Sequence, residues 1–512
     1  MSAAADAEVA VLIVGGGPVG LTARALLARW GVPALLVEKH GELSPFPRSR
    51  LVNVRSMEIF RGLGVAPAIT ARAFPPEYGR VRFRDALHGR DFATEAMVGV
   101  HAPVPESPAL GVVTSQDRLE PTLLGAADAP VRFGVELVDL AEEAEAVVAV
   151  LLDRRRGLRT RVRARHVLAA DGAHSFVRQR LAIGTTGPGA VGHLTTVVFD
   201  ADLDHWRARQ PAGVYFTTHG SFLPLYPEGG WAWIAPTPED AAGADWPGLV
   251  SRALGADAGV RAEVLRVEHW VVNAFVAERL RAGRVLLAGD AAHAIPPAGG
   301  LGMNAGVADV HNLCWKLAGV LHGWAGPDLL DTYETERLPV AHRTLRQAVT
   351  HTRLMFQVQS RRREQLMAGG AAPADVGLPW SERYFAQLGL VLGVAYGSDA
   401  ASDGGVDYVP TAEPGHRMPH LWLAPGRSTL DAFGEWFTLL TPDPPGWERQ
   451  TAAAWPLRVE PLSGEHAGLC GLGTRGGLLI RPDGHVGARW DHRPPNGSPL
   501  RDALAALTGP DR

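Results

Sequence analysis

The hydrophobic pattern of the first forty residues predicts a strand, a helix and a second strand. An apolar run at 10–14 leads into a glycine-rich turn at 15–20, an alanine- and leucine-rich stretch reaches Trp30, and a second apolar run at 33–37 ends at Glu38. Short continuous apolar runs are typical of strands that are buried on both faces of a parallel sheet. The pattern therefore predicts the βαβ unit of a doubly wound α/β fold.

The turn has the glycine spacing of a dinucleotide-binding site. Gly15 allows the tight turn, Gly17 lets a pyrophosphate approach the backbone, and Gly20 lets the helix pack closely on the strand. The N-terminus of the helix that follows the turn directs its free N–H groups at the phosphates. Glu38 stands where an acid accepts hydrogen bonds from a ribose and repels a 2′-phosphate, so we expect FAD or NAD rather than NADP in this site.

Two later apolar runs, 167–170 and 285–288, each lead into an aspartate and a glycine. The pairs are Asp171-Gly172 and Gly289-Asp290. An acid at the end of a strand can hold the hydroxyls of a ribityl chain, although each pair by itself could equally be a strand-ending turn. Three such sites in this order favour one flavin dinucleotide.

A proline- and glycine-rich loop at 296–300 precedes a predicted long helix. Apolar residues recur at three- and four-residue spacing from Val307 to Leu321, which predicts a helix that begins near Met303. Its N-terminus carries a partial positive charge that would stabilise the negative charge of a reduced flavin.

Composition narrows the class of protein. The chain has 512 residues, 46% of them hydrophobic, a net charge of −4 and no long run of either sign. Nothing in this balance indicates a nucleic-acid partner. No apolar run reaches the ~18 residues that span a membrane, and the N-terminus has no signal-peptide pattern, so we expect a cytoplasmic protein. The two cysteines, Cys314 and Cys470, form no metal-ligand spacing, and no metal is expected.

Together these motifs resemble the class A FAD-dependent aromatic hydroxylases, the para-hydroxybenzoate hydroxylase-like family, and within it the aromatic polyketide hydroxylases. Further matching segments are Pro47-Arg48-Ser49-Arg50, Gln116 to Glu120, and Asp331 to Pro339. The resemblance implies that Arg48 and Gln116 contact FAD. An exposed surface arginine and a polar residue at a helix start are the respective alternatives.

The resemblance also implies the rest of the FAD site. Asp290 would bind the ribityl-pyrophosphate region, and Gly302, Met303 and Asn304 would hold the pyrimidine edge of the flavin. The full set of expected cofactor residues is Gly15, Gly17, Pro18, Gly20, Glu38, Lys39, Arg48, Gln116, Asp171, Gly172, Gly289, Asp290, Pro297, Gly300, Gly302, Met303 and Asn304.

The implied activity is hydroxylation of a polycyclic aromatic, polyketide-type phenol or quinone with O₂. NADPH or NADH would bind transiently and reduce the flavin, since there is no second dinucleotide-binding βαβ unit, and oxygen would react as a flavin C4a-hydroperoxide. His219 and Tyr226 are the candidate catalytic residues. His219 could assist the deprotonation of a phenol, because histidine titrates near neutral pH. A histidine in a surface loop is the alternative for His219. The expected substrate pocket is Tyr215, Phe222, Trp231, Trp233 and Pro296.

The expected architecture is α/β with three parts. A Rossmann-like FAD-binding domain of the glutathione reductase type takes up 1–180 and 270–345, with an antiparallel β-sheet substrate domain inserted at 181–269. A helical segment and linker at 346–409 leads to a thioredoxin-like domain at 410–512. That domain lacks Cys-x-x-Cys and cannot exchange a disulfide. The resemblance is compatible with a homodimer.

Three alternatives compete with hydroxylation. Trp231 to Pro236 nearly matches a flavin-dependent halogenase signature, but halogenases need a catalytic lysine, and this chain has only Lys39 and Lys316. Baeyer–Villiger or ring-opening oxygenation of a similar substrate stays open. So does a protein that binds a flavin or another ligand without catalysis.

Two positions conflict with the local pattern. Arg24 lies in the first helix, where small or apolar residues are usual, and the sequence offers no explanation for it. Pro339 should kink or break the helical stretch that it enters, and we expect a second helix from Val340 to about Met367.

Overall fold

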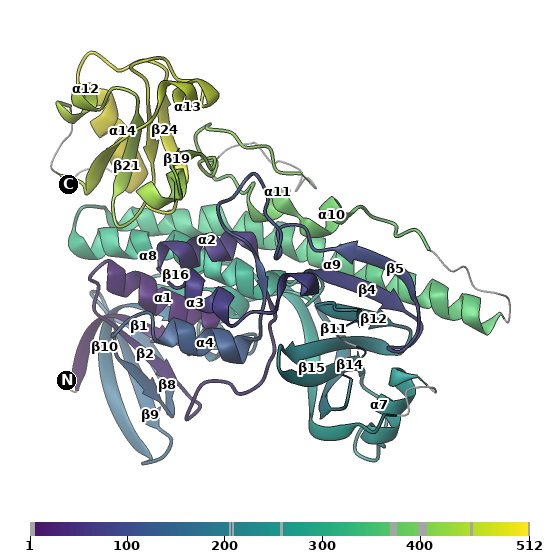
Figure 1. Ribbon diagram of the computed structural model, residues 1–512. Coiled ribbons are helices and arrows are strands. Elements are labelled where there is room, and N and C mark those ends of the chain that lie inside the picture. The colour runs from purple at the N-terminus through teal and green to yellow at the C-terminus, as the bar shows by residue number, and fades with distance from the viewer. Residues whose placement is uncertain are drawn as a thin grey trace.

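The computed structural model describes residues 6–203, 206, 209–255, 260–368, 376–397, 407–450 and 454–509. Figure 1 shows a first sheet near the N-terminus, a second sheet beside it, and a smaller C-terminal region that sits over two long helices. Residues 369–375, in the predicted linker, lie outside the described residues.

The first sheet has the predicted parallel core. Its order is β16-β17-β10-β1-β2-β7, in which β1 lies parallel to both β10 and β2, and β9 joins β8 to β10. Its strands are β1 (Ala7–Val14), β2 (Ala34–Glu38), β7 (Val131–Phe133), β8 (Val135–Glu142), β9 (Val147–Asp153), β10 (Leu158–Ala169), β16 (Arg281–Ala282) and β17 (Val285–Leu287). Val11, Leu12 and Ile13 are fully buried, which is why β1 is apolar on both faces.

Short helices pack around this sheet and lead to the second one. Helix α1 (Pro18–Arg29) follows β1 directly, as the βαβ prediction requires. The other short elements are α2 (Val54–Gly62), α3 (Ala66–Ala71), η1 (Pro76–Tyr78), α4 (Gln116–Leu124), α5 (Phe176–Arg180), η2 (Gly289–Ala291), α10 (Glu382–Ala386) and α11 (Leu388–Val391), with β3 (Leu51–Val52) paired to β6 (Val112–Val113).

The second sheet is almost entirely antiparallel. Its order is β18-β15-β11-β14-β13-β12-β4-β5, and only β12 and β4 run parallel. Its strands are β4 (Arg80–Arg84), β5 (Asp91–Ala96), β11 (Thr185–Asp200), β12 (Val214–Thr217), β13 (Gly220–Tyr226), β14 (Gly229–Pro236), β15 (Glu263–Ala277) and β18 (His293–Ala294), with α7 (Trp246–Leu254) behind them. The sheet therefore takes in 80–96 and 293–294 in addition to strands from the expected insertion.

Two long helices connect the regions. Helix α8 (Leu301–His322) packs against α1, and after η3 (Pro327–Leu330) helix α9 (Asp331–Met367) runs on beside the second sheet. The predicted break at Pro339 is wrong, because α9 is one helix through that position. A proline inside a helix loses one backbone hydrogen bond and crowds the carbonyl of the preceding turn, and the packing of α9 on β15, β16 and β18 offsets that cost.

The C-terminal region has a thioredoxin-like sheet of order β22-β21-β23-β24. Only the β21–β22 pair is parallel. The elements are β19 (Trp422–Ala424), β20 (Arg427–Ser428), η4 (Thr429–Ala432), β21 (Phe437–Thr441), α12 (Pro444–Glu448), β22 (Leu457–Pro461), α13 (Gly464–Leu469), β23 (Gly477–Ile480), β24 (Val486–Trp490) and α14 (Ser498–Thr508). Ser428 and Asp431 form a capping box at the start of the 3₁₀ turn η4.

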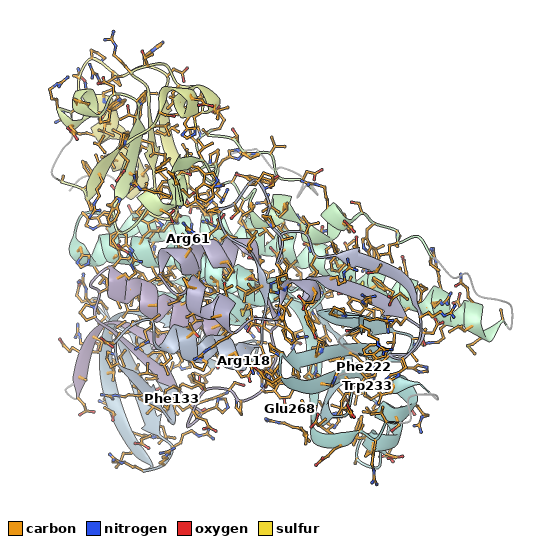
Figure 2. The ribbon with its side chains drawn as sticks, viewed as in Figure 1. Arg61, Arg118, Phe133, Phe222, Trp233 and Glu268 are labelled. Carbon is orange, nitrogen blue, oxygen red and sulfur yellow. The ribbon has the colours of Figure 1, made fainter. Side chains whose placement is uncertain are left out.

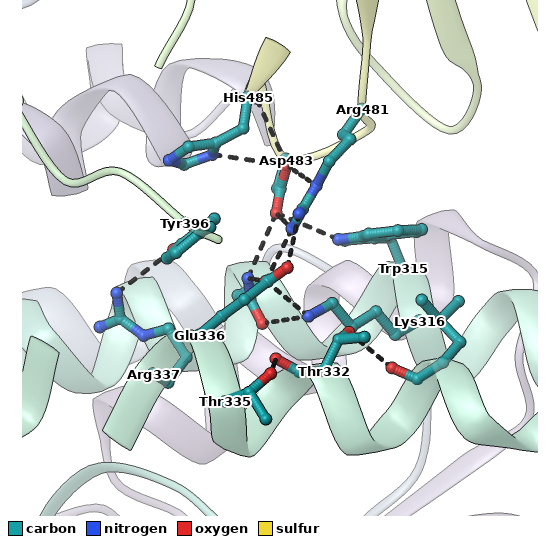
Figure 3. A network of polar contacts seen from close by, with 12 residues as sticks. Trp315, Lys316, Thr332, Thr335, Glu336, Arg337, Tyr396, Arg481, Asp483 and His485 are labelled. Carbon is teal, nitrogen blue, oxygen red and sulfur yellow. Dashed lines mark hydrogen bonds and ion pairs between the residues drawn. The ribbon is translucent and has the colours of Figure 1, made fainter. Parts of the chain in front are cut away.

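A buried ionic network joins this region to α8 and α9 (Figure 3). Glu336 accepts hydrogen bonds from Lys316 Nζ at 2.7 Å and from both terminal nitrogens of Arg481 at 2.6 and 2.9 Å. Asp483 accepts from Arg481 and, at 3.2 Å, from the indole of Trp315. Lys316 is thus held in a structural ion pair, so a halogenase could draw only on Lys39.

Candidate functional site

A cavity of about 2200 Å³ lies between the two sheets. Its walls include the turn after β1, the end of β2, the N-terminus of α8, strands β12 to β15 and one side of α9. Single small-ligand sites usually measure roughly 300–1,000 Å³. The cavity therefore has room for a dinucleotide and a second aromatic molecule together.

The glycine turn forms one end of this cavity. Gly15 has φ +110°, and a Cβ there would lie 2.2 Å from the carbonyl oxygen of Ala170. A Cβ on Gly20 would lie 2.0 Å from the carbonyl oxygen of Gly15, so the strand and helix could not approach. Gly17 is different: its backbone is extended, and a Cβ there would meet no protein atom within 4 Å. Gly17 therefore borders open space where a pyrophosphate fits.

Glu38 holds the turn together from the end of β2. Its Oε2 accepts from the backbone N–H of Gly16 at 2.7 Å, and its Oε1 accepts from that of His40 at 2.8 Å. A carboxylate has further lone pairs, which remain available for ribose hydroxyls. Lys39 and Pro18 also line the cavity.

Asp171 mainly stabilises the start of α5. It accepts from the hydroxyl of Ser175 at 2.6 Å and from the N–H of Val177 at 3.1 Å, and burial raises the pKa of its carboxyl. Gly172, with φ +84°, lies beside it in the cavity wall. The contacts of this aspartate fit the alternative that the sequence left open, a turn at the end of a strand.

Asp290 faces the cavity above a buried ionic cluster. Its carboxyl has a pKa raised by burial within the protein, although the side chain is exposed to the cavity. Beneath it, Asp309 accepts from the N–H of Gly289 at 3.1 Å, from Arg337 Nε at 2.8 Å, and contacts His293 Nε2 at 2.6 Å. Burial alone would raise the pKa of Asp309, but His293 and Arg337 lower it to about 2. The cluster fixes the Gly289-Asp290 turn.

The N-terminus of α8 forms another part of the cavity wall. Gly300, with φ +63°, caps the helix, and residues 301–303 have no intrahelical partner for their N–H groups. Pro296, Pro297, Gly302 and Met303 line the cavity here. This part of the wall can bind a negatively charged ring edge.

Asn304 was expected to hold the flavin, but its side chain binds the protein backbone instead. Its amide nitrogen donates to the carbonyls of Leu51 and Gly300 at 2.8 and 2.6 Å, and its oxygen accepts from the N–H of Asn53 at 2.9 Å. It therefore connects β3 to the start of α8, and Asn304 is not among the residues that line the cavity.

Arg48 and Gln116 both lie in the cavity wall. Gln116 donates to Glu120 Oε1 at 2.6 Å, and Glu120 also accepts from the N–H of Ser44 at 3.2 Å. Burial raises the pKa of Glu120 to about 7. Glu120 was not singled out from the sequence, because its contact with the loop at 44 is not a local one.

The four aromatic residues expected in the substrate pocket lie on the other face of the second sheet. Tyr215, Phe222, Trp231 and Trp233 are at most 6% exposed and form a core cluster with α7. Figure 2 shows Phe222 and Trp233 in this part of the molecule. Because side chains alternate along a strand, their neighbours line the cavity instead. These neighbours are Val214, Phe216, Leu223, Ala232 and Ile234.

This assignment of faces predicts opposite effects at adjacent positions. Leu223→Trp should fill the cavity and weaken substrate binding about tenfold, equivalent to about 1.4 kcal/mol, with little change in stability. Phe222→Leu should instead lower the free energy of unfolding by about 1 kcal/mol and leave substrate affinity unchanged. Thermal unfolding and equilibrium binding of an anthraquinone measure the two effects. The reverse pattern would contradict the assignment.

His219 and Tyr226 stand at opposite ends of β13, roughly 20 Å apart at the rise of a strand. His219 lines the cavity, and burial together with Arg363 lowers its pKa, so the ring is neutral and can accept a proton. The hydroxyl of Tyr226 donates to Asp117 at 2.7 Å, and burial and Asp117 raise its pKa. The two side chains cannot act on the same substrate atom, and of the two only His219 lies in the cavity lining described.

Among the residues that the structure describes, no helix is long and apolar enough to cross a membrane. The same residues contain no group of three or more His, Cys, Asp or Glu side chains that could hold a metal ion.

Comparisons with known proteins match this geometry. Residues 8–348 match the family described as FAD binding domain, and 411–510 match the aromatic-ring hydroxylase C-terminal domain. The tetracenomycin A2 monooxygenase-dioxygenase of Streptomyces glaucescens is 34% identical, over 98% of this chain and 97% of the relative. The aklavinone 12-hydroxylase RdmE of Streptomyces purpurascens is 34% identical, over 95% of this chain and 96% of the relative. The solved flavin-dependent monooxygenase PieE, in complex with FAD and substrate, is 32% identical, with a TM-score of 0.87 over 99% of this chain and 100% of that one.

Proposed function

The chain belongs to the family of FAD-dependent aromatic-ring hydroxylases, and from that premise we propose that it hydroxylates a polycyclic aromatic phenol or quinone with O₂ and NAD(P)H. One observation supports the proposal most strongly: a single cavity is lined both by the glycine turn after β1 and by an apolar face of the second sheet. Relatives named for tetracenomycin and aklavinone support a polycyclic substrate.

The residues present fit FAD. Gly17 leaves space for the pyrophosphate, Glu38 offers lone pairs to the adenosine ribose, and Asp290 lines the cavity as well. The N–H groups at 301–303 would meet the pyrimidine edge of the flavin. When bound, FAD supplies the oxygen-activating chemistry, and the protein supplies position and electrostatics.

The second sheet would hold the substrate over that cofactor. Phe216, Leu223 and Ile234 give an apolar surface on which a flat ring system can pack and from which water is excluded. His219, which lines the cavity and has a pKa lowered by burial and by Arg363, would take a proton from a substrate hydroxyl. A hydroxyl that loses its proton makes the ring more electron-rich and easier to hydroxylate.

Turnover in ¹⁸O₂ tests the proposal. Purified protein with FAD, NADH or NADPH and a hydroxyanthraquinone should oxidise the nicotinamide faster when the quinone is present, and should yield product with one ¹⁸O as a new hydroxyl. An ¹⁸O within a ring or an opened ring would establish the Baeyer–Villiger or ring-opening alternative. NAD(P)H oxidation that no polycyclic phenol or quinone stimulates would favour a non-catalytic binding protein. The expected homodimer and cytoplasmic location stay predictions.

A further inference from the structure

Arg50 places a buried positive charge in the wall of the cavity, directly before β3. The residue is 8% exposed. Its Nη1 donates to the carbonyl of Gly213 at 3.0 Å, and its guanidinium carbon lies 5.3 Å from the centre of the Phe74 ring. Its Nε and Nη2 are buried and have no hydrogen-bond partner.

The other buried arginines of the described ranges are better satisfied. Arg337, Arg417 and Arg481 each bind a carboxylate, while Arg24 and Arg178 bind backbone carbonyls. Within those ranges, Arg50 alone among buried arginines has two guanidinium nitrogens without a partner. Leaving a buried donor unpaired lowers the stability of the protein, and the cost is larger for a charged group. A ligand that supplied two acceptor oxygens would remove this cost.

The protein does not neutralise this charge by direct contact. Burial lowers the pKa of Arg50 to about 9. The more distant Tyr226, Asp117 and Tyr215 act in the opposite direction and raise it. One oxygen of the Asp117 carboxylate accepts from the hydroxyl of Tyr226, and the other oxygen has no hydrogen-bond partner among the described residues. Arg50 is therefore still a cation at neutral pH.

The two free donors lie on the same edge of the guanidinium plane. In arginine the Nε–H and one Nη2–H point the same way and form a fork that matches two oxygens side by side. Gly213, which holds the opposite side of the group, packs on the apolar side chains of Met97 and Val113, and both line the cavity. The site therefore combines an apolar surface with a fork for paired oxygens.

We propose that Arg50 binds two neighbouring oxygens on one edge of the aromatic substrate, and so decides which edge of the ring system lies in the cavity. Such a pair is present in a hydroxyl and a carbonyl at peri positions of a quinone, or in a carboxylate. The inference deepens the proposed function and rests on it for the class of substrate.

Equilibrium binding to the FAD-loaded protein, followed by tryptophan fluorescence, tests the proposal without turnover. 1-Hydroxyanthraquinone has the peri pair and 2-hydroxyanthraquinone lacks it, while anthraquinone-2-carboxylate compared with anthraquinone tests the carboxylate. In the wild type, at least one compound with paired oxygens should bind about tenfold tighter than the matched compound that lacks them, as expected for hydrogen bonds to a charged group. The pair that shows the preference identifies the source of the oxygens.

Two variants decide between a fork and a simple charge. Arg50→Met removes the charge and the paired donors, whereas Arg50→Lys keeps the charge without the paired donors. Each variant should therefore lose the preference for compounds with paired oxygens, while its affinity for FAD stays within about twofold of the wild type. Arg72→Met, at an exposed arginine, is the control and should keep it. The proposal is overturned if the wild type shows no preference, if Arg50→Lys keeps it, or if either variant loses FAD instead. Because only binding is read, absence of turnover would not affect this result.

Discussion

Gly17→Val is expected to weaken FAD binding roughly 100-fold, equivalent to about 3 kcal/mol, while the protein still folds. The valine side chain would project into open space, because a Cβ at this position meets no protein atom within 4 Å. Its backbone is extended, so the substitution introduces no strain. Loss of a glycine at a helix N-cap costs at most about 1 kcal/mol of stability.

Fluorescence titration of the apoprotein with FAD measures this effect, and thermal unfolding of the apoprotein monitors the fold. Gly464→Val is the matched control, since a Cβ on Gly464 also meets nothing within 4 Å but lies at the start of α13. Equal FAD affinity for both variants would show that the glycine turn does not contact the cofactor.

Glu336→Ala is expected to lower the free energy of unfolding by about 3–5 kcal/mol, because it leaves buried cations without their counter-charge. Lys316 and Arg481 both bind this carboxylate, and both are at least 90% buried. The loss should appear first as undocking of the C-terminal region from α8 and α9, which the network joins.

Denaturant unfolding with Glu435→Ala as the control separates this network from a surface pair. Glu435 pairs with Arg29 at 2.6 Å, but the pair is partly exposed and should contribute at most about 1 kcal/mol. A similar loss in both variants would contradict the role given to Glu336.

The same network predicts a direction for acid denaturation. Burial alone would raise the pKa of Glu336, but Arg481 and Lys316 lower it to about 2. A carboxyl whose pKa is lower in the folded protein than in the unfolded chain stabilises the fold at pH values above the unfolded pKa. This stabilisation is lost as the pH falls towards 2. The wild type should therefore lose more stability than Glu336→Ala between pH 5 and pH 2 (rough limits from this linkage).

The cofactor half of the site was predictable because its constraints are local. A dinucleotide requires glycine at fixed spacing between a buried strand and a helix, so Gly15, Gly17 and Gly20 carry the signal within six residues. The N-terminus of α8 was recognisable for the same reason, from a glycine-rich loop before a helical pattern.

The substrate half was not predictable in the same way, because both faces of β12 to β14 are buried. One face packs on α7 and the other lines the cavity, and apolar residues occupy both. Most of the large aromatic side chains of these strands fill the core and smaller side chains line the cavity, with Phe216 as an exception. Size alone therefore pointed to the wrong face for Tyr215, Phe222, Trp231 and Trp233.

Long-range contacts explain the other differences. Arg24, unexplained in the sequence, donates to the carbonyls of Ala129 and Leu124 and so ties α1 to the end of α4. Asp309 lies in a helical pattern that gave no sign of its contacts with His293 and Arg337. Partners this far apart in sequence leave no periodic pattern.

Titration of the wild-type apoprotein with FAD tests most directly whether three distant chain segments form one flavin site. The account predicts saturation at one FAD per chain. It also predicts that NADH or NADPH reduces the bound flavin while FAD stays in the glycine turn that contains Gly17. Failure to bind FAD, or displacement of FAD from the cavity by a nicotinamide dinucleotide, would contradict it.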